Sequence, residues 1–378
     1  MKGTKTHLIP LILIPAILVL ALALSLARLE NGELCYLPED QVKALAERAL
    51  NAGVPYKEVE AFLNFVRLSC NKPELRDEIR DLLRRYSSVN LSRQSFYQLV
   101  DSLNADVHYS GKPELFENYR PPGVRVPLVY LNNQGFNVHH INSLNLATAA
   151  LVYRGNWSEF LEILDGMLRY LEFDGDVAFF KFYFAWETAD IPWVSSISQG
   201  IGAGYYALAY YKTGNVTYLK VAKGLARSFN VPLERGGFRI ELPEGPFYLE
   251  YSHAPDDHVL NGFMLSLKGL SIYTKLVDDP IAERNLREGL ATLTKIIHKY
   301  DCGSWSLYSP KHGKANERYH RLHIRLLYYL GKAENMPVLI EYSKKWDNYL
   351  IRTGAKSELP RAREVAEFWF SLIDSLKS

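Results

Sequence analysis

The sequence of 378 residues predicts an all-α fold, chiefly because helical stretches come in pairs at a regular spacing. The turns within and between pairs also carry helix-stop signals, such as Gly155, Gly214 and Asp278-Asp-Pro280. Four helical hairpins of similar length predict an (α/α)4 toroid, in which an inner ring of helices lies inside an outer ring. An ordinary all-α bundle stays the alternative. The expected pairs are 138–153 with 157–172, 195–213 with 216–229, 257–277 with 281–300, and 318–331 with 336–352.

The connections between pairs contain short strand-like pieces, Val177–Phe184 and Gly237–Leu242, which predict β-hairpin loops at one mouth of the toroid. A final helix near 360–376 is expected to pack on the outside. Upstream, residues 38–104 read as short amphipathic helices opened by Pro38, Pro73 and Ser92. We therefore expect an N-terminal segment over 1–30, a small helical region over 31–110 and the toroid over 111–378.

Leu8 to Ala27 is an uncharged, mostly apolar run of 20 residues, preceded by Lys2 and Lys5. Such a length matches a membrane-spanning helix, and the basic flank predicts that the N-terminus is cytoplasmic. The expected localisation is a single-pass membrane protein whose C-terminal body is extracytoplasmic, at the cell surface or in a lumen. The alternative is a cleaved signal peptide and a secreted body, because Ala21 to Ala27 is rich in small residues.

Charge and motifs exclude several functional classes. A formal net charge of +2 argues against nucleic acid as a partner. The chain has no Gly-rich phosphate loop, HExxH or GxSxG motif, which excludes nucleotide enzymes, zinc proteases and α/β hydrolases. In an oxidising compartment Cys35 and Cys70 could pair and leave Cys302 free. No cysteine or histidine spacing indicates a metal site.

Polar and aromatic clusters lie in the loops between the helical pairs. Taken singly, each has a simple structural explanation: Ser195 caps a helix, Glu250 is a solvated charge, and Tyr308 and Tyr319 are packing residues. Four clusters at equivalent places on successive hairpins instead predict a shared site. The clusters are Trp193 to Gly200, Glu250-Tyr251, Asp301 to Tyr308 and Arg318 to His323.

These segments resemble, in order over about residues 124–350, the C-terminal catalytic domain of D-glucuronyl C5-epimerase, the heparosan/heparan sulfate family. The Asn261-Gly-Phe-Met264 block with its flanks is the most specific part. The other matching segments are Val126-Pro-Leu, Gln134-Gly-Phe136, Ser195-Ser-Ile-Ser-Gln-Gly200, Tyr248-Leu-Glu-Tyr251, Tyr300-Asp-Cys-Gly-Ser304 and Tyr319-His-Arg-Leu-His-Ile324.

The resemblance implies an (α/α)4 barrel and an isomerase that converts D-glucuronate to L-iduronate within a polysaccharide, as in heparan sulfate biosynthesis. It implies no redox cofactor. By motif position Glu250, Tyr308 and Tyr319 match catalytic residues, and Tyr251 and Asn261 match substrate contacts. The family's β-rich N-terminal domains have no counterpart here, so the polymer and the oligomeric state stay open, with a homodimer as one expectation.

Epimerisation requires two acid–base groups on opposite faces of the sugar and cationic groups at its carboxylate. We expect Tyr308 on one face and Tyr319 or Glu250 on the other, with tyrosine pKa values lowered by nearby cations. The candidates to hold the uronate carboxylate are Lys311, Arg318, His320 and Arg321.

Three alternatives stay open. A uronate polysaccharide lyase begins with the same proton abstraction but expels the substituent at carbon 4. A glycoside hydrolase would use Glu250 with Asp256 or Asp257 as its carboxylate pair. A non-catalytic surface glycan-binding protein would keep the fold without turnover.

Overall fold

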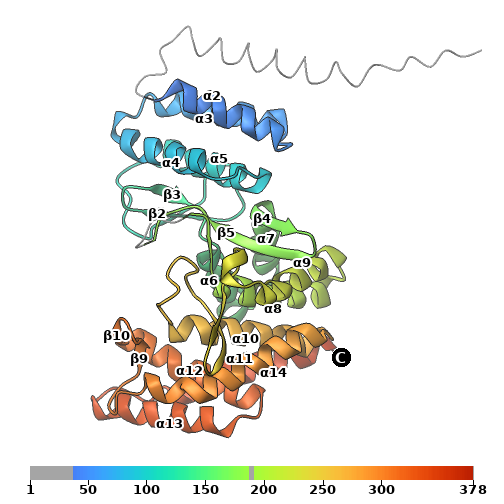
Figure 1. Ribbon diagram of the computed structural model, residues 1–378, viewed down its shortest axis with the longest axis vertical. Coiled ribbons are helices and arrows are strands. Elements are labelled where there is room, and N and C mark those ends of the chain that lie inside the picture. The colour runs from blue at the N-terminus through green and yellow to red at the C-terminus, as the bar shows by residue number, and fades with distance from the viewer. Residues whose placement is uncertain (1–36, 187–190, 378) are drawn as a thin grey trace, which may run out of the picture. The chain divides into compact units, whose positions relative to one another are not determined.

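The computed structural model describes residues 37–186 and 191–377. Contacts divide the chain into two compact units, one ending at Val138 and the other beginning at His139 (Figure 1). The domain bounds expected from the sequence, 1–30, 31–110 and 111–378, stay a prediction.

Over residues 37–138, the described part of the N-terminal unit, the chain forms four α-helices and a small antiparallel sheet. α3 packs on α5, α2 packs on α3 and α4, and β3 lies against α5. A capping box at Ser92 begins α5. The Ser92 hydroxyl accepts a hydrogen bond from the Ser95 backbone N–H, and the Ser95 hydroxyl accepts one from the Ser92 backbone N–H. The elements are α2 (Glu39–Asn51), α3 (Tyr56–Ser69), η1 (Pro73–Leu75), α4 (Arg76–Ser88), α5 (Arg93–His108), β1 (Asn118–Tyr119), β2 (Leu128–Leu131) and β3 (Gly135–Asn137).

The C-terminal unit is built from four pairs of consecutive helices. Gly155 and Gly214 end the first helix of two pairs in the left-handed conformation, and Asp279 with Pro280 begins another helix. The first helices of the pairs pack in chain order, α6 on α8, α8 on α10 and α10 on α12. The pairs are α6 (His140–Arg154) with α7 (Trp157–Met167), α8 (Ser196–Thr213) with α9 (Val216–Arg227), α10 (Leu260–Leu276) with α11 (Pro280–Ile296), and α12 (Glu317–Ala333) with α13 (Pro337–Arg352).

The closest of these contacts joins α8 and α10, which lie side by side in Figure 1. A Cβ on Gly269 of α10 would lie 2.1 Å from the carbonyl oxygen of Gly200 in α8, closer than any real contact. A Cβ on Gly200 would in turn lie 2.5 Å from the backbone oxygen of Ser266. The two helix backbones can therefore touch only because both positions lack a side chain.

The last helix, α14 (Leu359–Lys377), packs on α12 and also reaches α8 and α10. Trp369 of α14 is fully buried and stacks on Tyr205 of α8, with ring centroids 5.7 Å apart. The expectation that this helix packs on the outside is therefore wrong. Its apolar face completes the packing of the first helices of the pairs, whereas its charged face is exposed.

The all-α class is wrong because the chain also forms several small sheets. Val177–Phe182 and its neighbours are rich in aromatic and β-branched residues, which favour strands over helix. In the C-terminal unit the sheets are antiparallel, and α9 packs on β5. The strands are β4 (Leu171–Asp174), β5 (Val177–Phe182), β6 (Trp193–Val194), β7 (Arg239–Leu242), β8 (Gly245–Tyr248), β9 (Leu307–Ser309) and β10 (Gly313–Lys314). The 3-10 turns are η2 (Leu168–Tyr170), η3 (Ser228–Asn230), η4 (Leu233–Arg235) and η5 (Ile297–Tyr300).

The predicted membrane helix and the single-pass localisation also need correction. Within residues 37–186 and 191–377 no helix is long and apolar enough to cross a bilayer. Even α14, with 19 residues, carries charged side chains such as Arg363, Glu364 and Glu367. Leu8 to Ala27 lies outside the described residues, as does Cys35 of the predicted Cys35–Cys70 pair, whereas Cys302 is free.

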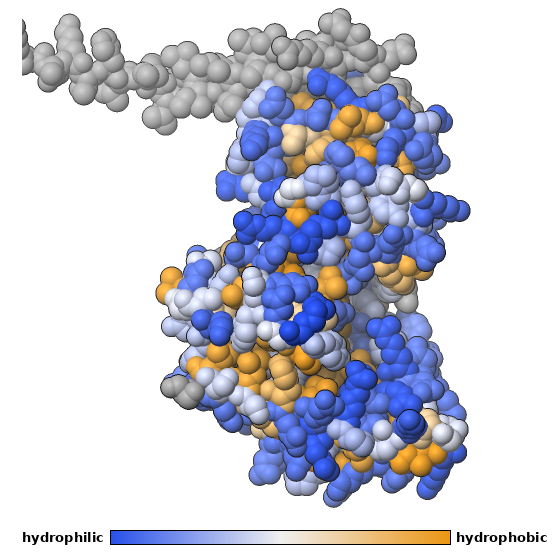
Figure 2. All heavy atoms as spheres, turned by 180° about the vertical axis from the view of Figure 1, so that it is seen from behind, coloured by the Kyte–Doolittle hydropathy of each residue, from blue (hydrophilic) through white to orange (hydrophobic). Residues whose placement is uncertain are grey.

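Figure 2 shows a mostly hydrophilic face with scattered hydrophobic patches. The exposed large hydrophobic residues come from several different elements, for example Leu68 of α3, Tyr153 of α6 and Ile351 of α13. Exposed hydrophobic residues scattered in this way are normal for a folded protein surface.

The glycine contact yields a stability prediction. Gly269→Ala should lower the free energy of unfolding by at least about 3 kcal/mol, because the new methyl group overlaps the α8 backbone, which cannot rotate away. Urea denaturation measures the change. Gly202→Ala in α8 is the matched control, since its methyl group would meet only the side chains of Leu225 and Phe180, at 3.0 Å or more. Equal effects of the two substitutions would contradict the argument.

Candidate functional site

Glu250 lies beneath the first turn of α10, where the chain leaves β8. The residue is only 6% exposed, and its carboxyl oxygen Oε2 accepts a hydrogen bond from Asn261 Nδ2, 3.1 Å away. A Cβ on Gly262 would lie 2.5 Å from both Cβ and Oε2 of Glu250. Asn261 therefore donates a hydrogen bond to the Glu250 carboxyl group, and Gly262, which has no side chain, leaves the space that this carboxyl group occupies.

The surroundings of Glu250 favour its neutral form. Burial is the main cause that raises the pKa of Glu250 to about 7, and the charge of Asp257 contributes in the same direction. Hydrogen bonds from Tyr251 and Asn261 act in the opposite direction. The carboxyl group can therefore accept or release a proton close to neutral pH, as an acid–base catalyst needs to do.

Three tyrosines extend from Glu250 toward solvent. The hydroxyl of Tyr251 shares hydrogen bonds with both Glu250 and Tyr308, so the three residues form a connected series. Tyr308 belongs to β9 and Tyr319 to the first turn of α12, and their ring centroids are 4.9 Å apart. Asn316, which caps α12 by accepting from the Tyr319 backbone at 3.0 Å, fixes this turn.

The expectation that cations lower the pKa values of these tyrosines is not met. Burial raises the pKa of Tyr251, Tyr308 and Tyr319, and the Glu250 carboxylate raises all three further. Arg318 lowers the pKa of Tyr319, but by less than these effects raise it. In the free protein the phenols are therefore proton donors, and Glu250 is the group ready to accept a proton.

These groups border a cavity of about 300 Å³. Asp257 is buried on its wall, where Oδ2 hydrogen-bonds with His312 Nε2 at 2.9 Å. Its other oxygen, Oδ1, has no partner among the described residues. The lining residues are Tyr251, Asp257, Tyr308, His312, Lys314, Asn316 and Tyr319. The structure thus brings Tyr251, Tyr308 and Tyr319 together at one cavity, with Glu250 and Asn261 behind Tyr251.

Two of the residues predicted to hold the substrate carboxylate point elsewhere. His320 is buried, stacks on Trp305 with centroids 3.6 Å apart, and hydrogen-bonds through both ring nitrogens, to Ser306 and to the Trp346 carbonyl. Burial lowers its pKa to about 4. Arg321 is held by Glu317 and Glu358, each 2.8 Å away. Neither reaches the cavity, because residues that follow Tyr319 in a helix face other directions.

The hairpin of β9 and β10 decides which basic side chain enters the cavity. Lys314 lies opposite Leu307 in this hairpin and lines the cavity, whereas Lys311 is exposed in the turn and does not line it. Arg318 is exposed beside Tyr319. The sequence analysis did not predict three residues of the cavity lining, which are His312, Lys314 and Asn316. The signal that could have indicated them is Gly313, because a glycine with positive φ (+73°) is typical of a β-hairpin.

A metal site was not expected, and no group of three or more His, Cys, Asp or Glu residues in the described part of the chain could hold a metal ion. The groups that border the cavity are the carboxyl group of Asp257, the phenols of Tyr251, Tyr308 and Tyr319, the imidazole of His312, the amine of Lys314 and the amide of Asn316.

Comparison with known proteins adds a family to this geometry. Residues 172–348, which include every residue of the cavity, match the family described as D-glucuronyl C5-epimerase C-terminus. The chain is 29% identical over 143 residues to an uncharacterized protein of Methanocaldococcus jannaschii, covering 37% of this chain and 46% of that protein. It is 28% identical over 183 residues to D-glucuronyl C5-epimerase of Caenorhabditis elegans, covering 43% of this chain and 30% of that protein. The matches thus span less than half of either relative.

The pKa of Glu250 predicts how stability varies with pH. Because its folded pKa, about 7, exceeds the ordinary value of 4.5, the folded state binds this proton more tightly, and stability is lost as pH rises from 4.5 through 7. Glu250→Gln removes that loss. Relative to the wild type, its free energy of unfolding should increase by about 2 kcal/mol between about pH 5 and about pH 8.

Urea denaturation at the two pH values measures this difference, and the exposed Glu283 offers a matched Glu→Gln control. A difference between Glu250→Gln and the wild type that does not change with pH would show that the carboxyl group is not destabilised by burial.

Proposed function

The chain carries a domain of the D-glucuronyl C5-epimerase C-terminal family, and on this premise we propose that it inverts carbon 5 of glucuronate residues within a polysaccharide. The observation that carries the proposal is the hydrogen-bonded series of Glu250, Tyr251 and Tyr308 beside Tyr319. It joins a buried carboxyl group of near-neutral pKa to a phenol on the cavity wall. Such a series can move a proton between substrate and protein near pH 7.

In this proposal the proton at carbon 5 passes to the phenolic oxygen of Tyr308. The Tyr308 hydroxyl proton moves to Tyr251, and the Tyr251 proton moves to the Glu250 carboxylate. The electron pair of the broken C–H bond stays on the substrate as the enolate of the uronate carboxylate. Tyr319 then donates its proton to the opposite face of carbon 5, and the electron pair forms the new C–H bond. Exchange with water returns Glu250 and Tyr319 to their starting states.

The substrate carboxylate needs positive charge, because the enolate carries one more negative charge than the uronate. Lys314 lines the cavity, and Arg318 is close enough to lower the pKa of Tyr319. We assign these two residues to the uronate in place of His320 and Arg321, which are engaged elsewhere. Asp257 and His312, which hydrogen-bond to each other, border the same cavity.

The proposal predicts isotope incorporation. In deuterated water with a glucuronate-containing polysaccharide, proton NMR should show deuterium at carbon 5 of glucuronate and the appearance of iduronate. Tyr308→Phe and Tyr319→Phe should each slow incorporation by about 100-fold or more, because each removes one proton-transfer group. Tyr328→Phe, on the same helix as Tyr319 but outside the cavity, is the matched control and should retain wild-type incorporation.

Other products would identify other functions. An unsaturated uronate that absorbs in the ultraviolet would make the protein a lyase. Polysaccharide binding without label, unchanged in both tyrosine variants, would make it a glycan-binding protein. Full incorporation by Tyr319→Phe would remove this residue from the mechanism.

A further inference from the structure

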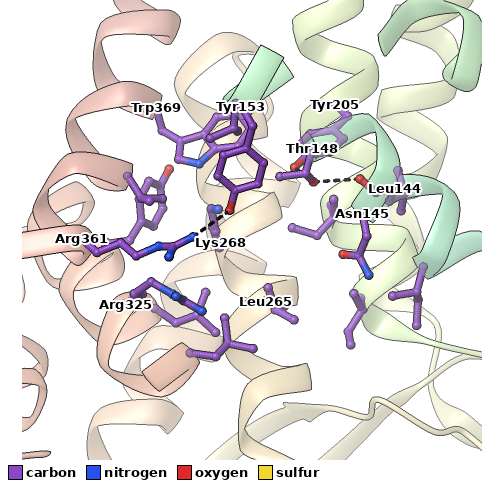
Figure 3. Close-up of a pocket in the computed structure, with 18 residues that line it drawn as sticks. Leu144, Asn145, Thr148, Tyr153, Tyr205, Leu265, Lys268, Arg325, Arg361 and Trp369 are labelled. Carbon is purple, nitrogen blue, oxygen red and sulfur yellow. Dashed lines mark hydrogen bonds between the residues drawn. The ribbon is translucent and has the colours of Figure 1, made fainter. Parts of the chain in front are cut away.

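A second cavity lies between the helices of the C-terminal unit, and the reaction proposed above does not use it. It has a volume of about 190 Å³ and is lined by residues of α6, α8, α10, α12 and α14 (Figure 3). None of its lining residues borders the cavity of Tyr308 and Tyr319. The close-up shows Lys268 near the middle of this lining, with Arg325 and Arg361 to one side.

Among the described residues, the ammonium group of Lys268 has no acidic partner. Its Nζ lies 4.7 Å from the ring centroid of Trp369 and 5.3 Å from that of Tyr329, so two aromatic faces provide its only charge-stabilising contacts among the described residues. Burial, together with the nearby charge of Arg325, lowers the pKa of Lys268 to about 7. The side chain is partly accessible, as expected for one that borders a cavity.

Most of the rest of the lining is basic or apolar, and its neutral polar groups are the Asn145 amide and the hydroxyls of Thr148, Tyr153, Tyr205 and Tyr329. Arg325 is neutralised by Glu358 at 2.8 Å, and Arg361 donates to the hydroxyl of Tyr153 at 3.4 Å. The lining contains Lys268, Arg325 and Arg361 but no Asp or Glu. The hydroxyls of Thr148 and Tyr205 bond to each other at 2.6 Å. The remaining surface is largely leucine, isoleucine, valine and aromatic rings.

This combination selects a class of ligand. The ammonium group of Lys268 favours a ligand with one negative charge, and the apolar walls favour a ligand whose remaining part is hydrophobic. A sugar fits poorly, because these walls are mainly apolar and several of its hydroxyls would lose water without gaining a partner. An apolar cavity of about 150 Å³ is large enough for benzene, so a single ring or a short aliphatic chain suits this volume. We propose that the cavity binds a small organic monocarboxylate, with its carboxylate on Lys268 and its apolar body against Trp369, Leu265 and Ile201.

The first experiment uses the wild-type full-length chain and matched probes. Isothermal titration calorimetry compares benzoate and hexanoate with benzamide and hexanamide, which have nearly the same shapes but no charge. At least one carboxylate should bind with a Kd below about 1 mM, and its amide should bind at least about tenfold more weakly. Absence of carboxylate binding up to about 10 mM, or equal binding of acid and amide, would overturn the proposal.

The second experiment locates the binding. Lys268→Met keeps a long apolar side chain and should weaken carboxylate binding by about tenfold or more. The matched control is Lys212→Met, which removes an exposed lysine whose Nζ lies 5.1 Å from the Trp157 ring centroid, and it should bind as the wild type does. Unchanged binding by Lys268→Met would place the ligand elsewhere. Should that variant not fold, the comparison of acid with amide still decides, because it needs only the wild-type chain.

Discussion

The backbone contact of α8 with α10 sets the position of both cavities. Gly200 and Gly269 let the two helices approach until their backbones touch, so the helix axes cannot slide or separate without opening the core. The start of α8 is bonded to the end of the β8 hairpin, through Ser196 N to the Leu249 carbonyl at 3.0 Å and Ser196 Oγ to the Tyr248 carbonyl at 3.1 Å. Glu250 follows directly. The packing of α8 on α10 thus positions Glu250 and the tyrosines connected to it. The same contact also fixes Lys268, which precedes Gly269 in α10.

Glu250 and Lys268 show how one physical cause produces two different sites. Burial destabilises the charged form of each, which raises the pKa of the carboxyl group and lowers that of the amine until both are about 7. Glu250 keeps neutral hydrogen-bond donors, Asn261 and Tyr251, and is connected to a polar cavity. In the described part of the chain, the contacts that stabilise the charge of Lys268 are the ring faces of Tyr329 and Trp369. The first arrangement suits transfer of a proton, and the second suits capture of a negative charge.

The sequence could predict those parts of the protein that depend on local pattern. The eight paired helices follow from periodicity and stop signals, whereas Glu250, Asn261, Tyr308 and Tyr319 were selected by resemblance to family motifs, and their roles stay a prediction. The side of α12 on which His320 and Arg321 lie could not be read, because it depends on Trp305 and Glu358, which are distant in sequence. Lys311 matches a basic position of the family by its spacing from Tyr308, but the register of the β9–β10 hairpin, which spacing alone does not reveal, brings Lys314 to the cavity instead. The inward face of α14 was missed because its partner, Tyr205, lies on α8.

The contact between Gly262 and Glu250 has a consequence for how the two positions can vary. A Cβ atom at position 262 would lie 2.5 Å from the carboxylate oxygen Oε2 of Glu250. Any side chain at position 262 would therefore displace the side chain of a glutamate at position 250. The shorter aspartate would retreat from the helix but would also leave Tyr251 and Asn261 without their acceptor. Substitutions at the two positions should therefore be coupled. Among relatives, we expect a change at position 262 only together with a change at position 250.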